Sequence, residues 1–190
     1  MLVAGLLAVL SASAAAGMRI ALPLLILGLL RSDELWSNVP VLSNFDPKVV
    51  LTVLTSWSLF ELFGSKSLLG QRTLQAIELV FSPFVGALMG ITVVNITRLE
   101  IPPIWLIGLV GGLLALVLKL VQVGWFFRLR GLPIWMVCLE DVLCICLVFF
   151  ALKAPEQGGL IAIFLLWLAV RSSQEWRRWY LEKKKLPIDR

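Results

Sequence analysis

The stretch IWLIGLVGGLLALVLKLVQVGWFF, residues 104–127, contains Lys119 as its single charged side chain. A helix that crosses the hydrocarbon core of a bilayer needs about 20 predominantly apolar residues. In lipid, every backbone amide must be hydrogen-bonded within its own helix or within a closed barrel. Transmembrane barrels use strands of roughly ten residues with alternating polarity, and this run does not alternate. The stretch therefore predicts a membrane-spanning helix.

The whole chain has the same character. Of its 190 residues, 59% are hydrophobic and only 15% are charged, and its mean hydropathy is +0.94. Soluble domains average about 25% charged residues. A chain of this size cannot bury so many apolar side chains, so some of them must face lipid. We expect an all-α fold class, a polytopic membrane helix bundle that forms one transmembrane domain over residues 1–190.

Hydrophobic runs separated by polar segments predict about six transmembrane helices. The expected spans are 2–30, 49–63, 74–94, 104–127, 134–152 and 159–171. A cleaved signal peptide is the alternative for the first run, but this run lacks a basic n-region and continues past Arg19. Proline lacks a backbone N–H, so Pro23 is expected to kink the first span.

Glycines mark the expected contacts between helices. Two pairs have the four-residue spacing that places small residues on one helix face and lets two backbones approach closely. These pairs are Gly86 with Gly90 in the third span and Gly108 with Gly112 in the fourth. Together with Gly17 in the first span, they are our predicted helix-packing positions.

Charge is unevenly distributed between the expected loops. Lys66, Arg72, Arg128, Arg130 and the basic tail 176–190 would share one face of the membrane. The loops that contain Asp33, Glu34, Asp46, Glu100 and Glu156 would share the other. Because Lys and Arg collect on the cytoplasmic side, we expect both termini in the cytoplasm.

Several kinds of chemistry are disfavoured by what the sequence lacks. It contains no histidine, and histidine is the commonest catalytic base and transition-metal ligand. Cys138, Cys144 and Cys146 have no accompanying fourth ligand, so packing between helices explains them better than a metal does. We expect no catalytic residues, no metal and no cofactor. The net charge of +5 gathers near the C-terminus, where it fits anionic lipid headgroups better than nucleic acid.

Five ionisable residues lie within or beside the apolar spans. They are Arg19, Glu61, Lys119, Glu140 and Asp141, and Lys66 at the end of the second span completes the candidate set. A charge at bilayer depth is unfavourable by several kcal/mol, so it normally faces the bundle interior and is paired. The sequence leaves two interpretations open: an ion or solute pathway, or buried salt bridges that fix the helix register.

Their order along the chain suggests two halves. Each half, 1–98 and 101–175, has three expected spans, and its cationic span is followed by an acidic one. Three spans per half would give the halves opposite orientations, as in transporters built from inverted repeats. Side chains do not otherwise align between the halves, so accidental division into threes is the alternative.

Four motifs resemble a family of bacterial and plastid membrane proteins known as domain of unknown function 4126. The motifs are Ala16-Gly17-Met18-Arg19 before Pro23, Glu61 before Gly64-Ser65-Lys66, Ser82-Pro83-Phe84-Val85-Gly86-Ala87, and Leu139-Glu140-Asp141. The chain departs from the family pattern at Ser65, where an Asp is frequent, and at Lys119 in a span associated with a His. The resemblance implies the architecture and a bacterial cytoplasmic or thylakoid-type membrane, but no activity.

The segment from Glu61 to Ser67 is also similar to the Glu-x-Gly-Asp-Lys-Thr signature of inverted-repeat cation exchangers. Here the segment has one extra residue and no Asp. A hard-cation site would therefore lack one of the oxygen ligands that such ions prefer.

Three functions remain open at this point. The first is a small ion or solute transporter, or a channel-like protein, that uses the buried charges. The second is a membrane scaffold or assembly partner, in which the glycine faces and the Trp-rich tail contact another membrane protein or a second copy. The third is pigment binding, for which the 8 Trp and 10 Phe would line a site without histidine.

Overall fold

The computed structural model describes residues 2–30, 46–64, 66–97, 103–129 and 131–185, all of whose regular elements are helices. The helices are α1 (Leu2–Met18), α2 (Ala21–Leu30), α4 (Pro47–Gly64), α5 (Leu68–Thr97), α6 (Ile104–Leu129), α7 (Ile134–Lys153) and α8 (Pro155–Lys185). The expected all-α class is confirmed for this part of the chain. Asp33, Glu34, Ser65, Glu100 and Arg130 lie outside the described residues.

Three of the described helices are long and apolar enough to cross a bilayer: α5, α6 and α7. The predicted starts of α6 and α7 are correct, because Pro103 and Pro133 precede apolar runs. The start of α5 was predicted too late, at residue 74. This helix begins at Leu68, and its first turns are polar and largely exposed, with Gln71 buried among them. The count of six spans stays a prediction.

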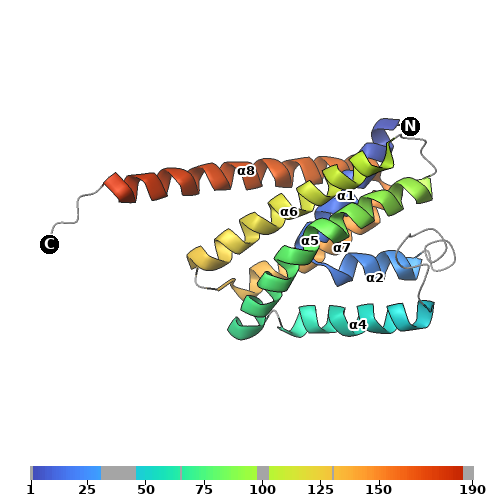
Figure 1. Cartoon of the computed structure of the whole chain (residues 1–190), viewed down its shortest axis with the longest axis horizontal. Coiled ribbons are helices and arrows are strands. Elements are labelled where there is room, and N and C mark those ends of the chain that lie inside the picture. The colour runs from blue at the N-terminus through green and yellow to red at the C-terminus, as the bar shows by residue number, and fades with distance from the viewer. Residues whose placement is uncertain (1, 31–45, 65, 98–102, 130, 186–190) are drawn as a thin grey trace.

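The first expected span is wrong as a single helix. It consists of α1 and α2, separated by a break at Arg19 and Ile20. Figure 1 shows α1 leading from the N-terminus into the middle of the bundle and α2 turning back toward the same end. Pro23 does not kink a helix. It lies in the first turn of α2, where the N–H that proline lacks would have no partner within the helix anyway.

The core of the bundle surrounds α1. This helix packs against α5, α6, α7 and α8, and every side chain from Ser11 to Arg19 is buried. Two of its hydroxyls hold the neighbouring helices: Ser11 Oγ donates to the Leu147 carbonyl at 2.7 Å, and Ser13 Oγ to the Gly86 carbonyl at 3.1 Å. Small side chains allow this close approach, as in membrane proteins generally.

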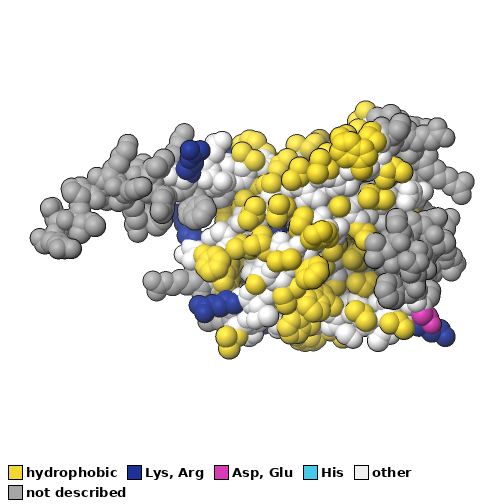
Figure 2. Space-filling view, viewed as in Figure 1, with side chains coloured by type: hydrophobic (Ala, Val, Ile, Leu, Met, Phe, Trp, Pro, Cys, Tyr) yellow, Lys and Arg dark blue, Asp and Glu magenta, His cyan; other side chains and the backbone are white. Residues whose placement is uncertain are grey.

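The outer surface is apolar across the middle of the bundle. Large hydrophobic side chains such as Phe84, Leu113 and Phe164 are exposed there, and Figure 2 shows Lys and Arg near the ends of the visible face. Such a surface is typical of helices that contact lipid. The three membrane-capable helices and this surface are compatible with an integral membrane protein.

The start of α1 and the end of α8 lie at opposite ends of the bundle's long axis, whereas six spans would bring both termini to one side. Figure 1 places the start of α1 at one end and the end of α8 at the other. The turn between α1 and α2 accounts for this arrangement, because α2 leads the chain back toward the end at which α1 begins. The segments that hold Lys66, Arg72 and Arg128 still share an end with the far end of α8. The side chains of Trp176, Trp179 and Tyr180 are outside the described ones.

Candidate functional site

The candidate site is built on the break between α1 and α2. Where a helix stops, its last carbonyls and first amides have no partner within the helix, and they give its ends partial negative and positive charge. A cation approaches the end of α1: Lys119 Nζ donates to the Met18 carbonyl at 3.2 Å. A carboxylate approaches the start of α2: Glu61 Oε1 accepts from the backbone N–H groups of Ile20 and Ala21, both at 3.2 Å.

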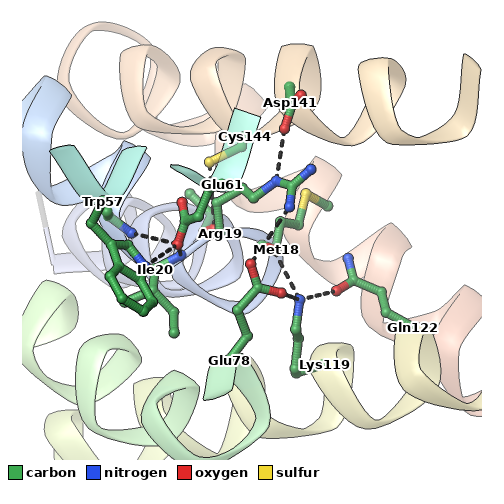
Figure 3. A network of polar contacts seen from close by, with 12 residues as sticks. Met18, Arg19, Ile20, Trp57, Glu61, Glu78, Lys119, Gln122, Asp141 and Cys144 are labelled. Atoms are coloured by element: carbon green, nitrogen blue, oxygen red, sulfur yellow. Dashed lines mark hydrogen bonds and ion pairs between the residues drawn. The ribbon is translucent and has the colours of Figure 1, made fainter. Parts of the chain in front are cut away.

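Arg19 lies in the break itself and joins two acids from other helices. Its Nε donates to Asp141 Oδ1 at 2.7 Å, and its Nη1 lies 3.5 Å from Glu78 Oε1. The second oxygen of Glu78 pairs with Lys119 Nζ. Figure 3 shows the resulting chain of contacts, Asp141–Arg19–Glu78–Lys119, with each member coming from a different segment. Two cations and two carboxylates thus neutralise one another inside the protein.

Glu78 was missed from the sequence, although it is the link between the two cations. It lies on α5 with Gln71 and Gln75, at a spacing of four and three residues, and all three are buried. Residues with this spacing share one helix face. A polar row of this kind in an otherwise apolar helix was the available signal.

Two further acids lie beside the charge chain without pairing to a cation. Glu61 also accepts from Trp57 Nε1 at 3.0 Å, but its Oε2 is buried without a partner. Glu140 Oε1 is buried without a partner as well. Of the six predicted polar candidates, Arg19 and Asp141 therefore pair directly, and Lys119 joins them through Glu78. Glu61 and Glu140 flank them, and Lys66 is exposed with its Nζ 5.3 Å from the Phe63 ring centroid.

Two spaces adjoin the cluster. A cavity of about 10 Å³ is lined by Arg19, Gln71, Leu74, Gln75, Glu78, Leu132, Val137 and Glu140. A larger pocket of about 260 Å³ lies between α6, α7 and α8 and is lined mostly by apolar side chains, with Gln122 and Glu140 among the polar ones. Glu140 and Leu132 line both spaces, and Glu140 is the ionisable side chain of the two.

The predicted packing positions lie where backbones come close. A Cβ added to Gly17 would lie 2.9 Å from the Ala115 backbone, and one added to Gly112 would lie 2.7 Å from the Pro83 carbonyl. Gly86, Gly90 and Gly108 also face neighbouring helices. Among the cysteines, Cys144 is buried with its Sγ 3.5 Å from the Ala15 carbonyl, whereas Cys138 and Cys146 are exposed.

Chemically, the cluster is a set of fixed charges at the ends of two short helices. Such ends serve as ion sites in transporters with broken helices: the amide end binds anionic groups and the carbonyl end binds cations. Here a Glu and a Lys of the protein occupy the two positions that external ions would take.

The sequence model of the family described as Domain of unknown function (DUF4126) matches residues 6–175 of the chain. This range includes every residue of the cluster. No curated protein and no solved structure matches the chain.

Proposed function

The chain belongs to the family called domain of unknown function 4126, and from its charged cluster we propose that it is a small transporter or channel-like protein for an ion or solute. The observation that carries this proposal is the broken helix, because Met18, Ile20 and Ala21 present backbone charges to Lys119 and Glu61 in the bundle interior.

The depth of the cluster supports the proposal. Glu78 and Lys119 are each ten residues from the end of their helix, which is about 15 Å of helix at 1.5 Å per residue. The hydrocarbon core of a bilayer is about 30 Å thick, and with α5 and α6 centred in it we place both residues within the core. Charges at such a depth are rare, and they mark ion pathways and proton relays in many membrane proteins.

We place the end of the bundle that holds Lys66, Arg72 and Arg128 in the cytoplasm, because Lys and Arg collect on that side. The far end of α8 is then cytoplasmic and the start of α1 is on the opposite side. A bacterial cytoplasmic or thylakoid-type membrane fits this polarity. The relation of 1–98 to 101–175 as inverted repeats stays a prediction.

Reconstitution into proteoliposomes tests the function. The measurement is charge movement after concentration jumps of KCl, NaCl or acid, with Glu61→Gln and Glu140→Gln compared with the unchanged protein. Glu156→Gln is the matched control, since Glu156 is an exposed acid at the start of α8. We expect currents that both cluster variants reduce and the control keeps. Absence of current for every ion would overturn the proposal.

A scaffold role is the alternative, and one feature favours it: α8 projects beyond the other helices in Figure 1. A projecting helix offers a surface for another membrane protein or a second copy. Purification in mild detergent separates the two functions. A stoichiometric partner together with silent proteoliposomes would favour the scaffold, and a self-contained bundle with currents would favour transport.

A further inference from the structure

The small cavity beside Arg19 is surrounded by polar atoms that have no partner. Arg19 Nη2, Gln75 Oε1 and Glu140 Oε1 are all buried without a hydrogen bond, and all three residues line the cavity. Buried polar atoms in proteins are nearly always satisfied by protein or by ordered water. A volume of about 10 Å³ is close to the minimum that holds one water molecule.

The chemistry of these atoms selects the occupant. They comprise one donor, the Arg19 guanidinium, and two acceptors, the oxygens of Gln75 and Glu140. A metal cation would meet the positive charge of Arg19, and an anion would meet the carboxylates of Glu78 and Glu140. A water molecule accepts from the guanidinium and donates to both oxygens, so it satisfies all three.

We infer that this cavity holds a single water through which protons reach Glu140, so that the proton is the coupling ion of the protein. This inference rests on the proposed function and names its ion.

Charge counting points to Glu140 as the group that takes the proton. Four charged groups face it: Arg19 from the break, Glu78 from α5, Lys119 from α6 and Asp141 from its own helix. These four pair among themselves, which leaves Glu140 as the surplus carboxylate. Glu61 also has no cation as a partner. It accepts hydrogen bonds from the first amides of α2, however, and the partial positive charge of this helix end compensates its negative charge.

The polar row on α5 supplies the route to the cavity. Gln71 lies nearest the start of the helix, at the end of the bundle that we place in the cytoplasm. Its side-chain amide forms two hydrogen bonds with the backbone of Leu132, with N···O distances of 3.2 and 3.1 Å. These two hydrogen bonds close the cytoplasmic end of the polar row Gln71–Gln75–Glu78. If they break, solvent can reach Gln75.

The proton step is balanced by the groups present. A proton that enters from the cytoplasmic side forms a new O–H bond with the cavity water while one of the existing O–H bonds of this water breaks. The released proton bonds to Glu140 Oε1 in the same step, so no hydronium stays beside Arg19. The products are a neutral water and a neutral carboxyl group, beside two cations that two carboxylates already balance. Net transfer requires that the Glu140 O–H bond then breaks and that a water molecule reached from the opposite side of the membrane accepts the proton, which leaves the carboxylate ready for the next one.

Proteoliposomes that contain a pH-sensitive dye test the inference. An external acid jump is applied while K⁺ with valinomycin holds the membrane potential at zero. We expect internal acidification with the unchanged protein and its loss in Gln75→Leu and Glu140→Gln. Gln75→Glu keeps an acceptor oxygen and should retain it. The matched control is Thr92→Val on the same helix, because Thr92 is buried but bonds only within α5, to the Leu88 carbonyl.

Each outcome decides between the two proposals. Acidification that persists in Gln75→Leu overturns the water relay. Currents for K⁺, Na⁺ or Cl⁻ without acidification overturn the proton as coupling ion and leave the proposed function standing. Absence of both current and acidification for every ion overturns the proposed function and the water relay with it. Thermal unfolding of each variant in detergent establishes that a lost signal does not reflect a lost fold.

Discussion

The two sides of the helix break are stabilised in different ways. The end of α1 is enclosed by α5, α6, α7 and α8, and Lys119, which binds its last carbonyl, is also held by Glu78 and Gln122. The start of α2 is held by Glu61 from α4, a helix that packs mainly on α2 and α5. Among the described side chains of α4, only Ser58 and Glu61 are buried.

The difference indicates which half of the site moves. An interior surrounded by packed helices opens only together with much of the fold, whereas a helix with few buried contacts opens locally at a lower free energy. We therefore expect the α1 side to stay fixed and α4, together with the start of α2 that it holds, to rearrange in the proposed transport. Four substitutions test this comparison.

Lys119→Met should have the largest effect. It removes a partner from both Glu78 and the Met18 carbonyl and leaves a buried carboxylate with one weaker ion pair. Breaking a buried pair in this way costs about 3–5 kcal/mol, measurable as the free energy of unfolding in detergent. Lys66→Met is the control, because this exposed cation contacts only the Phe63 ring and should change stability by less than about 1 kcal/mol. Equal losses of stability in Lys119→Met and Lys66→Met would contradict the enclosed, tightly paired state of the α1 side.

Gly17→Ala tests the enclosed side by overpacking. The new methyl group would lie 2.9 Å from the Ala115 backbone, so α1 and α6 would have to separate, at about 1–3 kcal/mol. Gly124→Ala on α6 is the matched control, because an added Cβ there meets no atom within 4 Å. It should raise stability by up to about 1 kcal/mol through helix propensity. An unchanged free energy of unfolding in Gly17→Ala would show that α1 and α6 separate without loss of stability.

Glu61→Gln tests the other side. The amide oxygen still accepts from Ile20 and Ala21, but the charge that strengthens these bonds is lost, so we expect a decrease of about 1 kcal/mol. Hydrogen exchange followed by mass spectrometry should become faster in α2 and α4 and stay unchanged in α1. Faster exchange throughout α1 would show that the two sides are not separate.

Ser172→Ala should have the smallest effect and sets the baseline. It removes the 2.7 Å hydrogen bond from Trp125 Nε1, which joins α6 to α8 away from the break. A single bond with solvent access contributes about 0.5–1 kcal/mol. Tryptophan fluorescence should report the loss, while exchange on both sides of the break stays unchanged. A change in α2 exchange would contradict this independence.

The sequence predicted the boundaries of the long helices better than the direction in which the chain turns. Apolar runs such as 104–127 and 134–152 placed α6 and α7 well, because their boundaries are prolines and charges that any helix respects. The reversal of the chain at Arg19 was not predictable from hydropathy, because hydropathy reports where apolar residues occur and not in which direction a helix runs. Pro23 was predicted to kink one long helix, but it lies in the first turn of a separate helix, α2.

For the site, the sequence predicted part of the buried charge but not how it pairs. It missed the buried Glu78 and included Lys66, which is exposed. Arg19, Lys119 and Asp141 were candidates because a lone charge in an apolar run must find a partner. That partner, Glu78, lies in a helix that passes alongside in three dimensions, and no local pattern specifies which helices become neighbours. The row Gln71–Gln75–Glu78 would have identified the inward face of α5.

The enclosure of α1 has a consequence for biosynthesis. Every helix that surrounds it comes later in the chain, from α5 onward. While the ribosome is still making those segments, Ser11, Ser13 and Arg19 lack the carbonyls and acids that will receive them. Arg19 therefore gains its Asp141 partner only after α7 has been synthesised, and a chain truncated before that codon would lack this ion pair.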